Sequence, residues 1–192
     1  VGCSDLIEER SAHRAEQFGI RQMTNEEILN DPEIKIVVNT TYPTAHYEVS
    51  KAALLAGKNV HCEKMMAVTL EEGEELIALA EQKGLKFGVA PDTFLGASHQ
   101  TARRIIDSGW IGEPFMVQAR VVRGYHPLME RMEDLSFVFK KGGGIPFDMG
   151  GYYLHDMIQL LGPVKRCGGF VQTRHPDRLC LNTKNPMYGK PL

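Results

Sequence analysis

Residues 142–156 (GGGIPFDMGGYYLHD) hold three side chains that can donate and accept protons. A run of glycines precedes a predicted helix in which Asp148, Tyr152 and His155 stand at i, i+4 and i+7, so an acid, a phenol and an imidazole share one face. The opposite side is apolar and carries Leu154, Met157, Ile158 and Leu161. A polar face of this kind either meets water or lines a cleft, and in a cleft these groups could carry out acid–base chemistry.

A second polar cluster, HCEKMM (61–66), comes at the end of an apolar segment that we expect to be an enclosed strand. Glu63 and Lys64 then lie at the tip of that strand. A lysine that is desolvated, or that lies beside a cationic ring, can exchange a proton with a substrate hydroxyl. The alternative is an ion pair on an exposed loop.

The first 90 residues alternate between short apolar segments and helical segments. We expect strands over 1–5, 34–39, 58–62 and 85–90, and helices over 7–18, 24–30, 44–56 and 69–84. Thr24 and Thr69 open capping boxes, and Gly19 and Gly84 follow helices. The β-branched segment IKIVVN is typical of a strand covered on both faces. This order predicts βαβ units and a parallel sheet.

The pattern changes after Pro91. We expect a helix over 98–107, an alternating strand at 114–122, a polar stretch over 123–141 and a further strand in 162–174. These elements favour a mainly antiparallel sheet with helices. The sequence therefore predicts an α/β domain over 1–92 and an α+β domain over 93–192.

Composition narrows the choice of partners. Lys and Arg number 22 and Asp and Glu 24, so the formal charge is −2, which argues against a nucleic-acid or anionic-membrane surface. No apolar run approaches the ~18 residues of a membrane span, and no signal-peptide pattern stands at the front. We expect a small-molecule substrate, with no nucleic-acid or membrane partner.

The cysteines and histidines indicate no metal site. Four cysteines are scattered without a C-x-x-C pair, which favours buried thiols in a reducing, cytoplasmic compartment over a disulfide or zinc framework. His61 lies inside a predicted strand, where we expect the core to hold it. Four other histidines lack partners at metal-ligand spacing, namely His13, His99, His126 and His175.

In an open parallel sheet, ligands bind beyond the carboxyl ends of the strands. Asp5 ends the first strand and could hydrogen-bond the ribose hydroxyls of NAD while repelling the 2′-phosphate of NADP, or it could cap the following helix. Arg10 and Arg14 lie close by, so NADP stays an alternative. The second strand leads into the turn NTTYPTAH (39–46), which could hold the cofactor, while His46 could instead cap a helix.

In this order, the segments resemble the Gfo/Idh/MocA family of nicotinamide-dependent oxidoreductases over essentially the whole chain. The matching features are the strand ending at Asp5 and the segments NTTYPTAH, AALLAGKNVHCEK, APDTFLG, IGEP and GGGIPFDMGGYYLHDMIQLLGPV. The resemblance implies a Rossmann domain that binds NAD or NADP. It also implies an α+β domain whose open antiparallel sheet mediates assembly into homo-oligomers.

The resemblance further implies roles for individual residues. Lys64 matches the lysine of the family's E-K-P motif, close to the nicotinamide and the reacting carbon. Asp148 matches the first acid of the D-x-G-x-H/Y helix, and Tyr152 stands where relatives have histidine or tyrosine. These three form the implied catalytic set, with Asp92 and His155 as substrate-side candidates. The implied cofactor contacts are Asp5, Thr40, Thr41, Tyr42, Pro43, His46, Glu63 and Lys64.

Three features depart from the family pattern. His155 and Asp156 overlap the zone where another acid often stands, so the substrate-side set stays open. Met65 replaces the usual proline, so the restraint that aims Lys64 is lost or is supplied by something else. The family's first strand and G-x-G-x-x-G loop are absent and the C-terminal sheet is incomplete, which indicates a chain truncated at both ends. Because that loop supplies the helix N-terminus that binds the pyrophosphate, the 192-residue chain is expected to bind NAD weakly.

We therefore expect the intact protein to be a dehydrogenase that moves a hydride between nicotinamide and a hydroxyl carbon of a sugar, polyol or related compound. Two alternatives stay open. One is an NAD-dependent glycoside hydrolase or lyase that oxidises its substrate only transiently, and the other is a nucleotide-binding regulatory relative without catalysis. Selectivity for the substrate is assigned to the polar stretch over 123–141 and to residues beyond Leu192.

Overall fold

The computed structural model describes residues 1–122, 141–173, 176–177 and 179–191. The chain divides into two compact units, Val1–Ala90 and Pro91–Leu192. The division therefore falls two residues before the boundary expected from the sequence. Most of the polar stretch to which selectivity was assigned, 123–140, lies outside the described residues.

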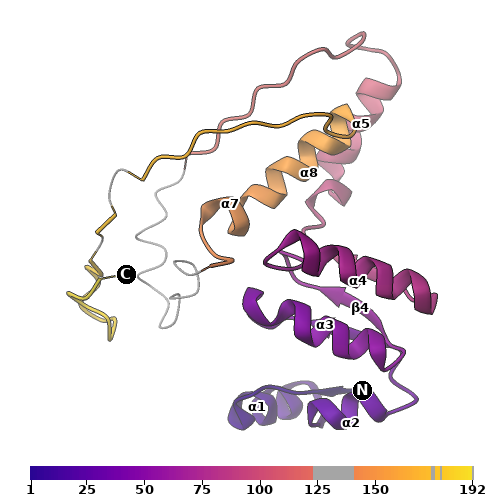
Figure 1. Ribbon diagram of the computed structural model, residues 1–192, viewed down its shortest axis with the longest axis vertical. Helices are drawn as coiled ribbons and strands as arrows, with labels where there is room; N and C mark the ends of the chain where they lie inside the picture. Colours follow the sequence, from indigo (N-terminus) through magenta and orange to yellow (C-terminus); the bar gives the residue numbers. More distant parts are fainter. Residues whose placement is uncertain (123–140, 174–175, 178, 192) are drawn as a thin grey trace. The chain divides into compact units, whose positions relative to one another are not determined.

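The first unit alternates between strands and helices (Figure 1). Its elements are β1 (Gly2–Cys3), α1 (Glu8–Phe18), β2 (Arg21–Gln22), α2 (Asn25–Asn30), β3 (Ile36–Asn39), the 3-10 helix η1 (Pro43–Ala45), α3 (His46–Leu55), β4 (Asn59–Cys62), α4 (Leu70–Lys83) and β5 (Phe87–Val89). β1 pairs with β2, and β3, β4 and β5 form a second sheet in that order. Every pairing is parallel, as predicted. The sequence pattern missed β2, because two polar residues carry no apolar signal.

Helix ends in this unit follow local side-chain chemistry. The side chains of Thr24 and Thr69 each accept a hydrogen bond from the backbone three residues on, where Glu27 and Glu72 return the contact. Gly84 closes α4 at φ 65°, a left-handed conformation that glycine adopts without strain. The predicted capping boxes are therefore confirmed.

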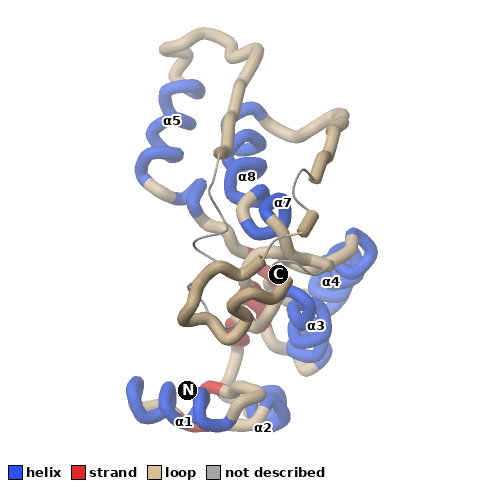
Figure 2. Tube along the Cα trace, turned by 90° about the vertical axis from the view of Figure 1, so that its left-hand side faces the viewer, coloured by secondary structure: helices blue, strands red, loops and turns tan. Residues whose placement is uncertain are grey.

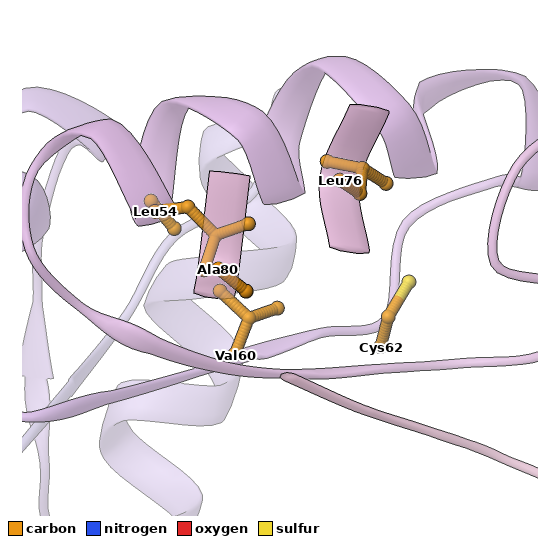
Figure 3. Packing of buried hydrophobic residues seen from close by; sticks show 6 residues of the cluster. Leu54, Val60, Cys62, Leu76 and Ala80 are labelled. Carbon is orange, nitrogen blue, oxygen red and sulfur yellow. The ribbon is translucent and has the colours of Figure 1, made fainter. Parts of the chain in front are cut away.

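α3 and α4 lie side by side and cover one face of β4 (Figure 1). Their buried side chains meet those of the strand in a core of Ala53, Leu54, Val60, Cys62, Leu76 and Ala80, most of which Figure 3 shows. Leu54 and Leu76 are fully buried. Burial of a leucine side chain stabilises a fold by about 1.5–3 kcal/mol, so this cluster holds the two helices on the sheet.

The other face of the same sheet is open. Ile36 and Val38 on β3 are 59% and 62% exposed, and His61 on β4 is also exposed. The prediction that IKIVVN is covered on both faces is therefore wrong, and so is the placement of His61 in the core. Side chains alternate along a strand, and α3 and α4 pack on the face of Val37 and Val60, which leaves the neighbouring side chains on the opposite face.

The described helices of the second unit are η2 (Thr93–Leu95, a 3-10 helix), α5 (Ala97–Asp107), α7 (Ile145–Asp148) and α8 (Gly150–Leu161). Figures 1 and 2 both show α5 beside α8. Arg103 on α5 donates from Nη1 to the backbone oxygens of Gln159 at 2.8 Å and Leu160 at 3.2 Å, near the carboxyl end of α8. His99 Nε2 lies 3.0 Å from the Asp156 carboxylate. These contacts orient α8 on α5.

The predicted strands at 114–122 and in 162–174 are not strands in the described part of the chain. Among the described residues of the second unit, β structure is limited to isolated bridges between Leu179 and Pro191 and between Cys180 and Tyr188. The prediction was wrong because alternation identifies a residue pattern that suits a strand, whereas a strand also requires a neighbour that completes its hydrogen bonds. Among the residues described, no helix combines the length and apolar character needed to cross a bilayer.

Replacement of Leu54 by alanine should test the core between α3, α4 and β4. Because Leu54 is fully buried, Leu54→Ala should lower the free energy of unfolding by about 2–5 kcal/mol. The adjacent Leu55 is 55% exposed, so Leu55→Ala should change it by less than about 0.5 kcal/mol. Urea unfolding of the intact protein, followed by circular dichroism, measures both values, and equal losses would contradict the burial of Leu54.

Candidate functional site

The turn that follows β3 is held by one buried amide side chain. Asn39 is 2% exposed and uses its full hydrogen-bonding capacity. Its Nδ2 donates to the Ser50 Oγ at 2.9 Å and to the His46 backbone oxygen at 3.1 Å. Its Oδ1 accepts from the Thr41 backbone N–H at 3.2 Å and from the Thr41 Oγ1 at 2.7 Å. Asn39 therefore ties the end of β3 to the start of α3.

His46, the first residue of α3, lies inside this turn and is 1% exposed. Its Nδ1 is 2.6 Å from the backbone oxygen of Met65, and its Nε2 is 2.9 Å from the backbone oxygen of Thr41. Both ring nitrogens are thus engaged by backbone carbonyl groups. The imidazole bridges the segments that follow β3 and β4.

Glu63, Lys64 and Met65 follow β4 directly. The Glu63 N–H donates to the Asn39 backbone oxygen at 2.8 Å, which extends the contact between the two strands past their ends. The Glu63 carboxylate accepts from the Lys64 backbone N–H at 2.9 Å. Glu63 is exposed, Lys64 is partly buried, and the peptide bond between Lys64 and Met65 is cis. Lys64 therefore lies at the carboxyl edge of the sheet, as predicted.

The residues of the turn after β3 that were expected to contact the cofactor lie at the same edge. Thr40, Thr41 and Tyr42 are exposed, and Pro43 begins η1 and is partly buried. Asp5 is exposed, and its Oδ1 accepts from the Ile7 N–H at 2.8 Å in the turn that enters α1. Asp5 thus shapes the chain before the helix with one oxygen, while α1 itself begins after Ile7.

A cavity of about 530 Å³ is lined in part by residues of β1 and β3 and of the segments that follow them. Its lining includes Val1–Ser4 and Ile36–Thr41. Most of this lining is aliphatic, and its hydroxyl groups belong to Ser4, Thr40 and Thr41, with Asp5 following Ser4 in the chain. No G-x-G-x-x-G loop occurs in the 192 residues. The hydroxyl groups of the lining could therefore hydrogen-bond a ribose, and the loop that would hold the pyrophosphate is not among the residues present.

The second unit carries the other catalytic candidates. Gly144 adopts φ 88°, a left-handed conformation, and its backbone oxygen accepts from the Asp148 N–H at 2.8 Å. Asp148 ends α7 and Tyr152 lies in the first turn of α8, so a break at Met149 separates them. Asp148 and Tyr152 are both partly buried.

The remaining polar candidates of this unit face different surroundings. His155 meets the Phe94 ring edge-on, with centroids 6.2 Å apart and planes at 87°. Asp156, its neighbour, pairs with His99 of α5. Asp92 is exposed and precedes η2. The helix face that carries His155 is therefore partly occupied by protein contacts.

The apolar side of α8 lies open along its length. Leu154 is 53% exposed, and Ile158 and Leu161 are 41% and 42% exposed. With Val117 and Val164 they line a groove. Opposite polar and apolar faces were predicted from the helical spacing, but that spacing did not indicate what covers the apolar one.

The catalytic candidates divide between the two units: Lys64 belongs to the first, Asp148 and Tyr152 to the second. Their meeting in one cleft stays a prediction. Asn39 and Ser50, which organise the turn after β3, were missed by the sequence analysis. The signal was present, because His46 and Ser50 stand at i and i+4 and so share a helix face. Within the described residues, no group of three His, Cys, Asp or Glu side chains gathers at metal-binding distance.

Comparison with known families matches both units. Residues 1–90 match the model of an oxidoreductase family with an NAD-binding Rossmann fold, and residues 99–187 match that of the GFO/IDH/MocA C-terminal domain. The chain is 35% identical over 137 residues to the uncharacterised oxidoreductase YhhX of Escherichia coli, across 71% of this chain and 38% of that protein.

Further relatives agree in fold. The chain is 32% identical over 142 residues to scyllo-inositol 2-dehydrogenase (NADP⁺) IolW of Bacillus subtilis, across 73% of this chain and 38% of that protein. A solved structure of a putative myo-inositol dehydrogenase from Sinorhizobium meliloti superposes with a TM-score of 0.70 at 22% identity, over 84% of this chain and 47% of that one. The chain thus spans less than half the length of these proteins.

Alkylation of the cysteines should test the environment at the end of β4. Burial raises the pKa of the Cys62 thiol to about 11, with a further rise from the nearby Glu63 charge and a partial offset from a hydrogen bond with Ser50. At pH 8 only about one such thiol in a thousand is ionised, so iodoacetamide should modify Cys62 far more slowly than the exposed Cys167. Peptide mass spectrometry measures both rates, which should converge in urea. Equal rates in native buffer would contradict the buried thiol.

Proposed function

Because the chain belongs to the Gfo/Idh/MocA family of oxidoreductases, we propose that the intact protein transfers a hydride between nicotinamide and a hydroxyl-bearing carbon of a sugar or polyol. One structural observation carries the proposal. The hydrogen bonds of Asn39 and His46 hold the turn after β3 and the segment with Lys64 together, at the carboxyl edge of a parallel sheet. Ligands of such sheets bind at that edge.

Lys64 is the proposed acid–base group. When nicotinamide is bound, it supplies the centre that accepts or returns the hydride. Oxidation of an alcohol also releases the hydroxyl proton, and a lysine at the sheet edge can take up that proton or return it in the reverse direction. The partly buried position of Lys64, with its backbone tied to the Glu63 carboxylate, suits such a role.

Asp148 and Tyr152 are the proposed substrate-side groups. The phenol of Tyr152 can donate to or accept from a substrate hydroxyl, and the Asp148 carboxylate can orient a neighbouring hydroxyl or the lysine. His155 and Asp92 are supporting candidates for substrate contact. Positioning of the reactants in this way supplies up to ~7–11 kcal/mol of rate acceleration in favourable systems.

Asp5 supports NAD as the cofactor, because its exposed carboxylate would repel a 2′-phosphate. Arg10 is exposed and lies near in sequence, and IolW is an NADP-dependent relative, so NADP is the alternative cofactor. The second arginine of this segment, Arg14, already donates a hydrogen bond from Nη1 to the Gln17 Oε1 at 2.6 Å within α1.

The assay for the proposed function uses the intact protein with a panel of myo-inositol, scyllo-inositol, D-xylose, D-glucose and a p-nitrophenyl glucoside, which carries a glycosidic bond. Each compound is mixed with NAD or NADP, and absorbance records the reduced cofactor. Accumulation of reduced cofactor supports a dehydrogenase. Glycoside cleavage that requires NAD without net reduction would instead indicate transient oxidation, and NAD binding without turnover of any compound would indicate a regulatory relative.

The proposed enzyme is a cytoplasmic homo-oligomer that assembles through its C-terminal part. The four cysteines are free thiols, which suits a reducing compartment. Large apolar side chains of the second unit are exposed: Phe115 at 94%, Val122 at 77% and Phe170 fully. Apolar surfaces of this kind are commonly covered by other protein segments. Light scattering of the intact protein tests assembly, and a monomer at micromolar concentration would contradict it.

Replacement of Lys64 should remove catalysis and retain the cofactor. Lys64→Ala in the intact protein should cut turnover by at least ~10²-fold, because a positioned proton-transfer group contributes about that much. NADH binding, followed by fluorescence, should persist. Lys35, an exposed lysine whose Nζ donates to the Pro32 backbone oxygen, provides the control Lys35→Ala, which should keep wild-type turnover. Near-normal turnover of Lys64→Ala would rule out the assignment.

Removal of one hydroxyl should test the substrate side. Tyr152→Phe deletes the phenolic group and preserves the ring, so turnover should fall by roughly 10–10²-fold with little change in NADH affinity. Tyr153, the next residue of α8, offers a matched control, because Tyr153→Phe deletes the same group one position away. Similar turnover in the two variants would remove Tyr152 from the catalytic set.

A further inference from the structure

We infer that His46 is the positioning residue that holds Lys64 in place by bridging the backbone oxygens of Thr41 and Met65. This inference rests on the proposed role of Lys64. His46 belongs to the turn that was expected to contact the cofactor, but its side chain is enclosed by protein atoms. The ring is 1% exposed, so it has almost no surface with which to touch a cofactor.

The two contacts of the imidazole are both to hydrogen-bond acceptors. Carbonyl oxygens only accept hydrogen bonds, so the ring must act as the donor. A neutral imidazole donates to one of the two oxygens, and a protonated imidazole donates to both. The distances of 2.6 Å to Met65 and 2.9 Å to Thr41 are short enough for either bond.

The bridge acts on Lys64 through the next residue in the chain. Met65 stands where the Gfo/Idh/MocA pattern has proline, whose ring restrains the backbone beside the lysine. Methionine lacks that ring, and here the backbone oxygen of Met65 is held by His46. A hydrogen bond from a buried side chain thus supplies a restraint on the segment that carries Lys64.

The anchor of the bridge is rigid. His46 begins α3, and the Asn39 amide holds its backbone oxygen at 3.1 Å. Two turns further along, Ala53 and Leu54 of the same helix are fully buried in the core. The hydrogen bond from His46 therefore links the backbone of Met65 to α3, which is packed on the buried core of the first unit.

Two amide variants separate the two halves of the bridge. The amide nitrogen of asparagine reaches about as far as Nδ1 of histidine, and that of glutamine about as far as Nε2. His46→Asn should therefore retain a donor for Met65 and lose the one for Thr41, whereas His46→Gln should do the reverse. His46→Ala removes both. His61→Gln on β4 is the control, because His61 is exposed and the substitution is the same.

Hydrogen exchange tests the bridge without any substrate. With the intact protein, mass spectrometry of peptides that cover 63–67 should show exchange about tenfold faster in His46→Gln and His46→Ala than in wild type. His46→Asn and His61→Gln should stay within about twofold of wild type. Equal exchange in His46→Asn and His46→Gln, or no increase in either, would overturn the inference. This readout needs no turnover, so it tests the His46 bridge even if the proposed function is wrong.

Kinetics then test whether the bridge acts through Lys64. With the panel compound of highest turnover, His46→Gln should lower kcat about tenfold while the KM for the cofactor changes less than about twofold. In a Lys64→Ala background the same substitution should have no further effect, because the group that it positions is gone. Multiplicative losses in the double variant would overturn the positioning role. Absence of wild-type turnover on every compound would count against the proposed function alone.

Discussion

The described part of the candidate site depends on the buried side chain of Asn39. Two strands end at this point, and their last backbone groups must find partners once water is excluded. The Asn39 side chain bonds two backbone groups, the Thr41 N–H and the His46 oxygen, and the hydroxyls of Thr41 and Ser50, while the Asn39 backbone oxygen accepts from the Glu63 N–H. A buried amide left without partners costs about 1–3 kcal/mol, so the full set of bonds favours one conformation of the turn.

This junction connects the hydrophobic core to the chemistry at the sheet edge. α3 is held against β4 by apolar contacts, and its first residue, His46, reaches from that fixed helix to the backbone beside Lys64. A long, flexible lysine at a strand end gains a defined position only if the backbone below it is fixed. The polar network and the apolar core therefore contribute to the same property, which is the placement of Lys64.

Short-range chemistry made most of the first unit predictable. Capping boxes at Thr24 and Thr69, a glycine after α4, and β-branched strand segments each act within a few residues, so the sequence shows them directly. The exposed face of β3 and the position of His61 could not be predicted in this way. An apolar segment shows that a strand can be buried, but which of its faces is covered depends on where the helices pack.

In the candidate site, too, some features follow from the sequence alone and others depend on the tertiary structure. The sequence by itself determined the residue types and their placement at strand and helix ends: Lys64 after β4, the hydroxyl-rich turn after β3, and Asp148 and Tyr152 four residues apart. Only the tertiary structure decided that His46 is enclosed between two carbonyl groups and that Asn39 joins two strands and a helix. The physical reason is the range of the interactions. Caps and turns act between close neighbours in the chain, whereas the contact between His46 and Met65 spans 19 residues and exists only after α3 has packed on the sheet.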